Sequence, residues 1–304
     1  MPGPNTDRGF TLIEMIISIT LVAIIAMAAA PMMRIPLVTW MDATRRAELA
    51  QSLDTVRSKL ADDLSRALPN SVRIRAVGAN RIYLETLEVR AWGRARLDVS
   101  GVAQACPAQC TATPGMEDVL EPACNETCFT SYGPLQGDVP VPGTDWVVVN
   151  PLSPVGAAGN PYFGGNVAVA NGIKTRLTNV AGAADGNRLD IAAHNFPAVP
   201  TSGRFYIVAT PVTWECNRNT GRLTRYWGYP VSAVQPVAFG AGTASAPLAT
   251  AVSDCTNAFR YQAAGRLGLG GVVHARFPLT LTSLDTQQAE RVEFVAALPV
   301  SEVP

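Results

Sequence analysis

The stretch DRGFTLIEMIISITLVAIIAMAAAP, residues 7–31, decides how the chain is anchored and therefore how its fold is organised. Residues 10–33 are apolar except at four positions, which are Thr11, Glu14, Ser18 and Thr20. A helix of this length extends roughly 36 Å, enough to cross the hydrocarbon core of a bilayer. We therefore expect a membrane-spanning helix over residues 10–33.

The carboxylate of Glu14 is out of place in such a span. An ionised carboxylate in hydrocarbon costs on the order of 3 kcal/mol, so its presence points to a function and to a cationic partner. If the chain were cut between Gly9 and Phe10, the new α-amino group would lie four residues from Glu14. In a stack of identical helices, the amine of an adjacent subunit could then neutralise the carboxylate.

A removable secretory signal peptide is the alternative interpretation, because Ala28-Ala29-Ala30 has the small residues of a cleavage site. Three features count against it. The apolar run is longer than the usual signal core, Pro31 would directly follow the cut, and a signal peptide has no use for Glu14.

The heptapeptide Arg8-Gly9-Phe10-Thr11-Leu12-Ile13-Glu14, followed by about twenty apolar residues, resembles the class III signal of type IV pilins and type II secretion pseudopilins. The resemblance implies that residues 1–9 are a leader, that a prepilin peptidase cuts after Gly9, and that Phe10 is then N-methylated. It assigns Glu14 to filament assembly. The implied partners are other major and minor pilins or pseudopilins, the prepilin peptidase/methyltransferase and an inner-membrane assembly platform.

The segment after the span predicts an amphipathic helix over residues 34–68, continuing into a globular domain. Apolar residues recur there at steps of three and four, at Leu49, Leu53, Val56, Leu60, Leu64 and Leu68. Such a stripe is typical of a helix packed on a sheet, with Asp62 and Asp63 on its solvated face. Because proline removes a backbone donor and crowds the preceding turn, we expect a kink or locally melted stretch at Pro31 and Pro36.

Residues 69–304 predict a β-rich domain. Charged residues make up 16% of the 304-residue chain, while 25 glycines and 23 prolines favour strands joined by turns. Period-two patterns predict strands at residues 72–77, 81–89, 95–99, 146–149, 166–170, 188–193, 204–213, 222–231, 272–282 and 291–297. Asn219-Thr220-Gly221 predicts a hairpin, and residues 101–145 and 150–165 predict loops. The fold class is thus α+β, a long N-terminal helix packed on an antiparallel sheet, pilin-like, with disulfide-stapled loops.

Six cysteines indicate disulfides in an oxidising compartment; they are Cys106, Cys110, Cys124, Cys128, Cys216 and Cys255. The first four form two short pairs and could instead ligate zinc. Three residues separate the cysteines of each pair, which is not the commonest spacing for zinc. Export to an oxidising compartment would also convert thiolates to disulfides. We therefore expect disulfides, with local pairing among residues 106–128, no metal and no cofactor.

A narrower resemblance involves ALPNSVRIRAVGANRIYLETL after the helix, FYIVATPVTWECNRNTGRLTRYWGY, and the terminal VEFVAALPVSEVP. These blocks cover about a third of the chain and are similar to MshO-like minor pilins of the mannose-sensitive haemagglutinin pilus system. The resemblance implies a Cys216–Cys255 disulfide.

The sequence offers no catalytic constellation, so we expect no enzyme. His194 and His274 have no nearby nucleophile pattern, and a formal net charge of zero argues against nucleic-acid binding. The aromatic group Trp214, Tyr226, Trp227 and Tyr229 could bind sugar, but cross-strand aromatic pairs also stabilise sheets.

The expected function is that of a minor pilin in a type IV pilus, helping to initiate assembly at or near the tip. A minor pseudopilin of a type II secretion system and a pilus-borne adhesin or carbohydrate-binding module are the alternatives. The precursor is expected in the bacterial inner membrane, with the C-terminal domain periplasmic before entry into the filament. The positive-inside rule favours the opposite orientation, since Arg34, Arg45 and Arg46 follow the span. The leader motif and the disulfides outweigh it.

Overall fold

The computed structural model describes residues 10–97, 118–122, 124–156, 159–183, 186–263, 271–284 and 287–300. The chain divides into two units, Met1–Gln51 with Leu281–Glu290, and Ser52–Thr280 with Arg291–Pro304. The described elements are one helix and a set of strands, α1 (Leu12–Ser65), β1 (Arg73–Val77), β2 (Arg81–Arg94), β3 (Asn125–Thr130), β4 (Gln136–Gly137), β5 (Trp146–Val149), β6 (Lys174–Ala183), β7 (Gly186–Asn195), β8 (Arg204–Asn217), β9 (Arg222–Trp227), β10 (Ala244–Ala249), β11 (Phe259–Ala263), β12 (Gly271–Thr282) and β13 (Ala289–Val300).

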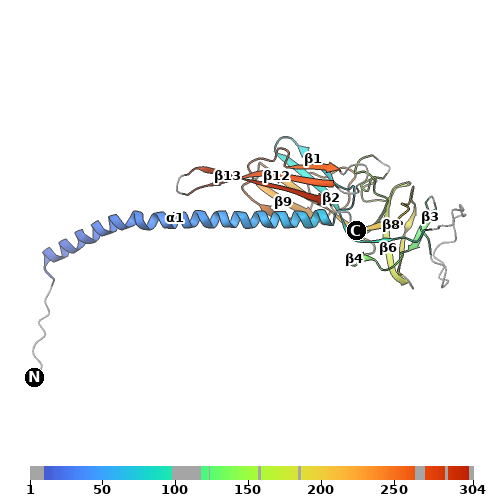
Figure 1. The fold of residues 1–304 in the computed structure, drawn as a ribbon, viewed down its shortest axis with the longest axis horizontal. Coiled ribbons are helices and arrows are strands. Elements are labelled where there is room, and N and C mark those ends of the chain that lie inside the picture. Colours follow the sequence, from blue (N-terminus) through green and yellow to red (C-terminus); the bar gives the residue numbers. More distant parts are fainter. Residues whose placement is uncertain are drawn as a thin grey trace, which may run out of the picture. The chain divides into compact units, whose positions relative to one another are not determined.

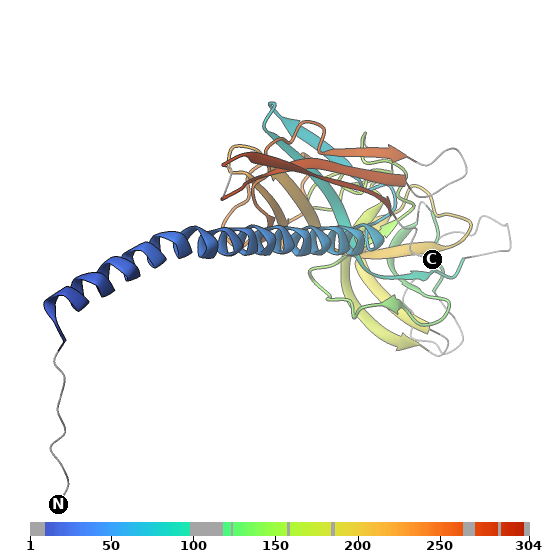
Figure 2. The same cartoon turned by 60° about the vertical axis from the view of Figure 1, so that its left-hand side comes forward.

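Helix α1 continues through both prolines as one coil (Figures 1 and 2). The predicted melting at Pro31 or Pro36 is therefore wrong, while a kink at these positions stays a prediction. Each proline deletes one intrahelical hydrogen bond and costs about 3 kcal/mol in a helix interior. Because helix formation is cooperative, the intact turns on either side stabilise the helix across the hydrogen bonds lost at the two prolines.

The C-terminal turns of α1 are packed in the second unit. Val56, Leu60 and Leu64 are buried, as the apolar stripe predicts. The chain leaving the helix then bonds to β2: Leu68 donates its N–H to the carbonyl of Leu87 (2.8 Å), and Val89 donates to the carbonyl of Arg66 (2.8 Å). These two bonds fix the end of the helix on the sheet of its own unit.

The main sheet branches at β8. Its order is β1-β2-β8-β5-β6-β7-β3, with β9 also paired to β8, β10 to β9, and β4 to β2. The first half of β8 pairs with β5 up to Val208, and the second half pairs with β9 from Val212. Pro211 lies between the two halves, opposite a bulge in β2 after Leu87. Because proline cannot donate to a ladder, a bulge is where a long central strand tolerates it.

Both faces of this sheet are buried at its centre. Along β5, Val147 and Val149 belong to one core with Phe129 and Phe205. Trp146 and Val148 belong to a second core, on the other face, with Tyr162. Successive strand side chains point to opposite faces, so an unbroken apolar run such as Trp146–Val149 indicates a strand covered on both sides.

A smaller sheet has the order β11-β12-β13, and Figure 1 shows β12 beside β13. Its strands alternate: along β13, Phe294, Ala296 and Leu298 are buried, while the residues between them are exposed. The rings of Phe277 and Phe294 stack with centroids 4.8 Å apart. One face thus joins a core, and the other is open to solvent.

The structure is consistent with the predicted α+β class, but strands make up far more of it than the picture of a long helix packed on a sheet implied. The hairpin at Asn219-Thr220-Gly221 is present between β8 and β9. The strand predicted at residues 166–170 is wrong. Of the strand predicted at residues 95–99, Ala95 forms only an isolated bridge with Ser131, residues 96–97 are not in a strand, and residues 98–99 lie outside the described residues. Strands β3 and β4 occupy part of the predicted loop, and β6, β10 and β11 were missed.

Candidate assembly site

The N-terminus of α1 is capped by two reciprocal hydrogen bonds between Thr11 and Glu14. The Glu14 N–H donates to Thr11 Oγ1 (3.4 Å), and the Thr11 N–H donates to Glu14 Oε2 (3.5 Å). The Thr11 hydroxyl also donates to Glu14 Oε2 (3.4 Å). This is a capping box, in which Thr11 is the N-cap and Glu14 the N3 residue. The carboxylate is thereby held beside the positive end of the helix macrodipole.

The other polar side chains of the span bond to the helix itself. Ser18 Oγ donates to the carbonyl of Glu14 (2.7 Å), and Thr20 Oγ1 donates to the carbonyls of Ile16 (3.0 Å) and Ile17 (2.9 Å). Residues Leu12–Ala29 are long and apolar enough to cross a membrane, and none of them is buried within the structure. Within Leu12–Ala29, Glu14 is the one ionisable side chain, so it carries the charge that a neighbouring subunit could meet.

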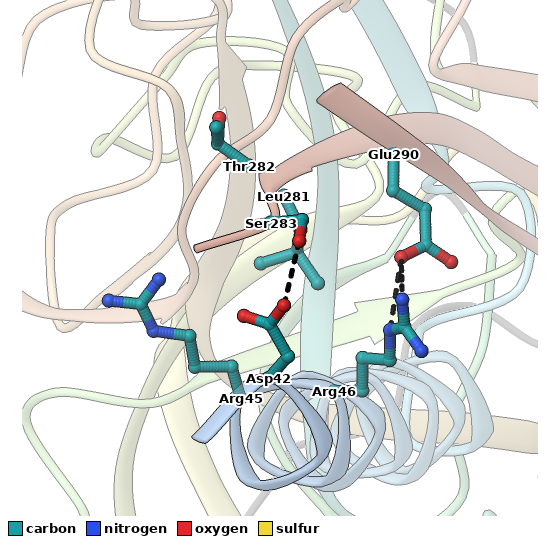
Figure 3. A pocket seen from close by; sticks show the side chains of 7 residues that line it. All are labelled: Asp42, Arg45, Arg46, Leu281, Thr282, Ser283 and Glu290. Carbon is teal, nitrogen blue, oxygen red and sulfur yellow. Dashed lines mark hydrogen bonds and ion pairs between the residues drawn. The ribbon is translucent and has the colours of Figure 1, made fainter. Parts of the chain in front are cut away.

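Further along the same unit, α1 contacts the tip of the β12–β13 hairpin (Figure 3). Asp42 accepts hydrogen bonds from the Ser283 hydroxyl (2.7 Å) and the Leu284 N–H (3.1 Å). These bonds lower the pKa of the Asp42 carboxyl. Arg46 pairs with Glu290 at 2.9 Å. We call these two contacts, Asp42 with Ser283–Leu284 and Arg46 with Glu290, the hairpin clasp.

In the second unit, α1 is fixed by a buried ion pair. The Asp63 carboxylate accepts hydrogen bonds from Nε (2.6 Å) and Nη2 (2.9 Å) of Arg225 and from the indole N–H of Trp214 (2.9 Å). Lys59 Nζ lies 3.2 Å from the same carboxylate. The prediction that Asp63 lies on a solvated face is therefore wrong, because its partners come from strands far along the chain.

A second interior polar network surrounds Glu85, which is fully buried and binds Arg73 through two hydrogen bonds of 2.9 and 3.1 Å. Burial raises the pKa of Glu85, while Arg73 opposes that shift. Nearby, Lys174 is 3% exposed, and its ammonium donates to the carbonyl of Gly165. Burial, with the positive charges of Arg73 and Arg176, lowers the pKa of Lys174 to about 7.

Cys216 and Cys255 form the expected disulfide, with Cα atoms 5.7 Å apart. Cys124 and Cys128 are buried and are also disulfide-bonded. A cysteine in a disulfide supplies no thiolate to zinc. Cys106 and Cys110 lie outside the described residues, as does Gly9, so the connectivity of the cluster stays a prediction. Within the described ranges, no three histidine, cysteine or acidic side chains are grouped as a metal would require.

Among the remaining sequence candidates, His194, Trp214, Tyr226 and Tyr229 have structural roles, whereas His274 is exposed on β12. His194 is buried, with Nε2 2.7 Å from the carbonyl oxygen of Gly172. Trp214 and Tyr229 are buried, and Tyr226 stacks on Phe239 with centroids 4.1 Å apart. These aromatic side chains therefore offer no continuous open platform for a sugar. The cluster around Asp63 was missed, and no local sequence signal identifies it.

Comparison with known families matches residues 4–30 to the prokaryotic N-terminal methylation motif. No curated protein and no solved structure matches the chain. The matched residues contain the predicted cleavage position, the methylated position and the Thr11–Glu14 cap. With the apolar first half of α1, the motif supports a membrane-anchored, type IV pilin-like substrate of the prepilin peptidase.

Proposed function

We propose that the chain is a minor subunit of a type IV pilus of the mannose-sensitive haemagglutinin type, acting in assembly initiation at or near the tip. The observation that carries the proposal is the N-terminal methylation motif, with a capped glutamate at the start of an exposed apolar helix. The Cys216–Cys255 disulfide that the MshO-like resemblance implies supports the finer assignment.

The size of the second unit supports a minor, terminal role. A body of roughly 240 residues has a radius of gyration of about 18 Å, whereas the helix that carries it is about 10–12 Å wide. In a bundle of closely packed helices, crowding between the attached bodies grows with their size. Sparse incorporation, or a place at the end of the filament, relieves that crowding.

Glu14 supplies the assembly contact. Cleavage after Gly9 creates a cation at Phe10, and a stagger of neighbouring helices can bring that amine to the Glu14 carboxylate of another subunit. In hydrocarbon, an unpaired carboxylate is costly and a paired one much less so, which favours the position that forms the pair. The capping box holds the carboxylate at the helix start before the partner arrives.

Three substitutions separate the cap from the charge. Glu14→Gln keeps a side chain that completes a capping box but removes the charge, whereas Glu14→Ala removes both. We expect both precursors to be cleaved after Gly9, and both mature chains to be lost from sheared filaments. Thr11→Ala, which weakens the cap and keeps the carboxylate, should retain most incorporation.

Immunoblotting of sheared filaments and of membranes measures incorporation, with the wild-type chain beside each variant. Normal incorporation of the glutamine variant would contradict the charge pair. Recovery of the wild-type chain with a type II secretion pseudopilus, and not with pili, would contradict the assignment to a pilus.

A further inference from the structure

The solvent-facing side of the sheet β11-β12-β13 contains a depression of about 700 Å³. Arg260 and Gln262 project from β11, His274 and Arg276 from β12, and Arg291 and Glu293 from β13, all of them exposed. Arg260 and His274 are direct cross-strand partners, so they lie on the same face. The volume is within the range of sites for small molecules, about 300–1,000 Å³.

Only some of the arginines that line this depression are paired with a carboxylate. Arg276 is engaged by Glu293, with Nε 2.6 Å from Oε1. Within the described part of the chain, Arg260 and Arg291 form no ion pair and no side-chain hydrogen bond, although the charge of Arg291 contributes to lowering the pKa of Glu293. The charged lining residues are three arginines against the two carboxylates of Asp254 and Glu293, a net charge of +1 with His274 neutral.

One rim of the depression is fixed by the Cys216–Cys255 disulfide. Residues Asp254, Thr256 and Asn257 form this rim and flank the bonded Cys255. Asp254 Oδ1 accepts from the N–H (3.0 Å) and the hydroxyl (2.9 Å) of Thr256. The backbone of the rim is also bonded to β12, where Arg276 N–H donates to the carbonyl of Ala258 (2.8 Å). The polar groups of the rim are therefore preorganised.

We propose that this face of the β11-β12-β13 sheet binds an acidic oligosaccharide, one whose carboxylates are spaced along a chain of hydroxyl-bearing rings. Arg260 and Arg291 recognise the sugar carboxylates, because a guanidinium matches a carboxylate with two parallel hydrogen bonds. Asp254 and Glu293 accept hydrogen bonds from hydroxyl groups. Gln262 and Asn257 donate and accept, which suits hydroxyl groups in either direction. This is a ligand-binding activity in addition to filament assembly.

The mixture of charges favours a glycan over other polyanions. A nucleic acid presents a phosphate at every nucleotide, so Asp254 and Glu293 would repel it, and sites for single strands use several aromatic platforms. Tyr261 is the one aromatic side chain among the lining residues. An acidic peptide offers few hydroxyl donors for the two carboxylates of the protein.

The test is a binding titration of the full chain, purified in a detergent without a sugar headgroup. The acidic probes are tetragalacturonate, tetramannuronate and an α2-3 sialylated trisaccharide, and fully methyl-esterified tetragalacturonate is the neutral counterpart. A twelve-nucleotide oligothymidylate and hexaglutamate represent the other polyanions. The variants are Arg260→Gln, Arg291→Gln and, as a matched control, Arg222→Gln, because Arg222 is an exposed strand arginine outside the depression.

We expect at least one acidic oligosaccharide to bind. Arg260→Gln and Arg291→Gln should each weaken its affinity about tenfold or more, as for a lost charge-assisted contact. Arg222→Gln should leave affinity unchanged. Because Arg260 and Arg291 are exposed, their variants should keep the wild-type thermal transition. The proposal is overturned if no acidic oligosaccharide binds, if the esterified one binds equally well, if Arg222→Gln weakens binding equally, or if oligothymidylate or hexaglutamate binds at least as tightly through the same arginines.

Discussion

The carboxylate of Asp63, on the last turns of α1, accepts hydrogen bonds of 2.6 and 2.9 Å from the guanidinium of Arg225 on β9. The two residues are 162 positions apart in the sequence, and their side chains are only 6% and 10% exposed. With Trp214 as a third donor, the pair ties the end of the helix to the sheet within the second unit.

Asp63→Asn should lower the free energy of unfolding by about 3–5 kcal/mol, because it leaves Arg225 buried without its counterion. The neighbouring Asp62→Asn is the matched control, since Asp62 is 42% exposed and its pairs with Lys59 and Arg66 lie at the surface. It should cost at most about 1 kcal/mol. Urea unfolding followed by tryptophan fluorescence measures both. Equal effects of the two substitutions would show that the buried pair is not the anchor.

Lys174 should make stability depend on pH. Its pKa is about 7 in the folded chain, lowered mainly by burial, and near 10.5 when unfolded. The unfolded state therefore binds more protons between these values, so stability is lowest below pH 7 and rises towards pH 10, by up to about 1.4 kcal/mol per pH unit. Lys174→Met should be more stable than wild type at pH 6 and should lack this rise.

The chain contains one other lysine, Lys59, which serves as the control for this measurement. Lys59→Met should keep the increase in stability between pH 7 and pH 10, measured by urea unfolding at each pH. Parallel stability curves for Lys174→Met and the wild-type chain across this range would contradict the role of Lys174.

Removing the disulfide through Cys216→Ser with Cys255→Ser should destabilise the second unit. The two residues are 39 positions apart, and closing such a loop restricts the unfolded chain by about 4 kcal/mol in the chain-entropy model. The measurement is the urea midpoint of the double variant against wild type under non-reducing conditions. A change below about 1 kcal/mol would contradict the stabilising role.

The hairpin clasp predicts a local change in hydrogen exchange. Asp42→Ala removes the acceptor of the Leu284 N–H and should speed exchange at Leu284. Arg45→Ala is the control, because Arg45 lines the same pocket (Figure 3) but makes no hydrogen bond or ion pair with the described hairpin residues. The lowered pKa of Asp42 means that the stabilisation from the Asp42 contact is fully present above about pH 3.8 and is lost as pH falls through the folded-state pKa. Unchanged exchange at Leu284 in Asp42→Ala would contradict the contact.

Local patterns predicted the elements whose burial alternates or is continuous. The run Trp146–Val149 and the alternation in β12 and β13 identify strands directly, and the stripe ending at Leu64 identifies the packed turns of α1. Strand β10 was missed because its sequence ASAPLA consists of small residues around Pro247 and has no strong apolar period. Strand β6 was missed for a related reason, since Asn179 and Gly182 interrupt it.

The tertiary sites could not be predicted in the same way. The role of Asp63 depends on Arg225 and Trp214, and no spacing rule connects positions so far apart. Likewise, the arginines of the depression come from three strands, and they share a face only once strand order and register are known. The N-terminal site differs because Gly9, Phe10, Thr11 and Glu14 lie within six consecutive residues, so the sequence alone identifies its chemistry.

The mass of the N-terminal peptide of the chain extracted from membranes shows directly whether the chain is processed after Gly9. We expect a mature chain that begins at Phe10 and carries one N-methyl group. A chain that begins at Met1, or one that begins at Pro31 after removal of a signal peptide, would contradict it.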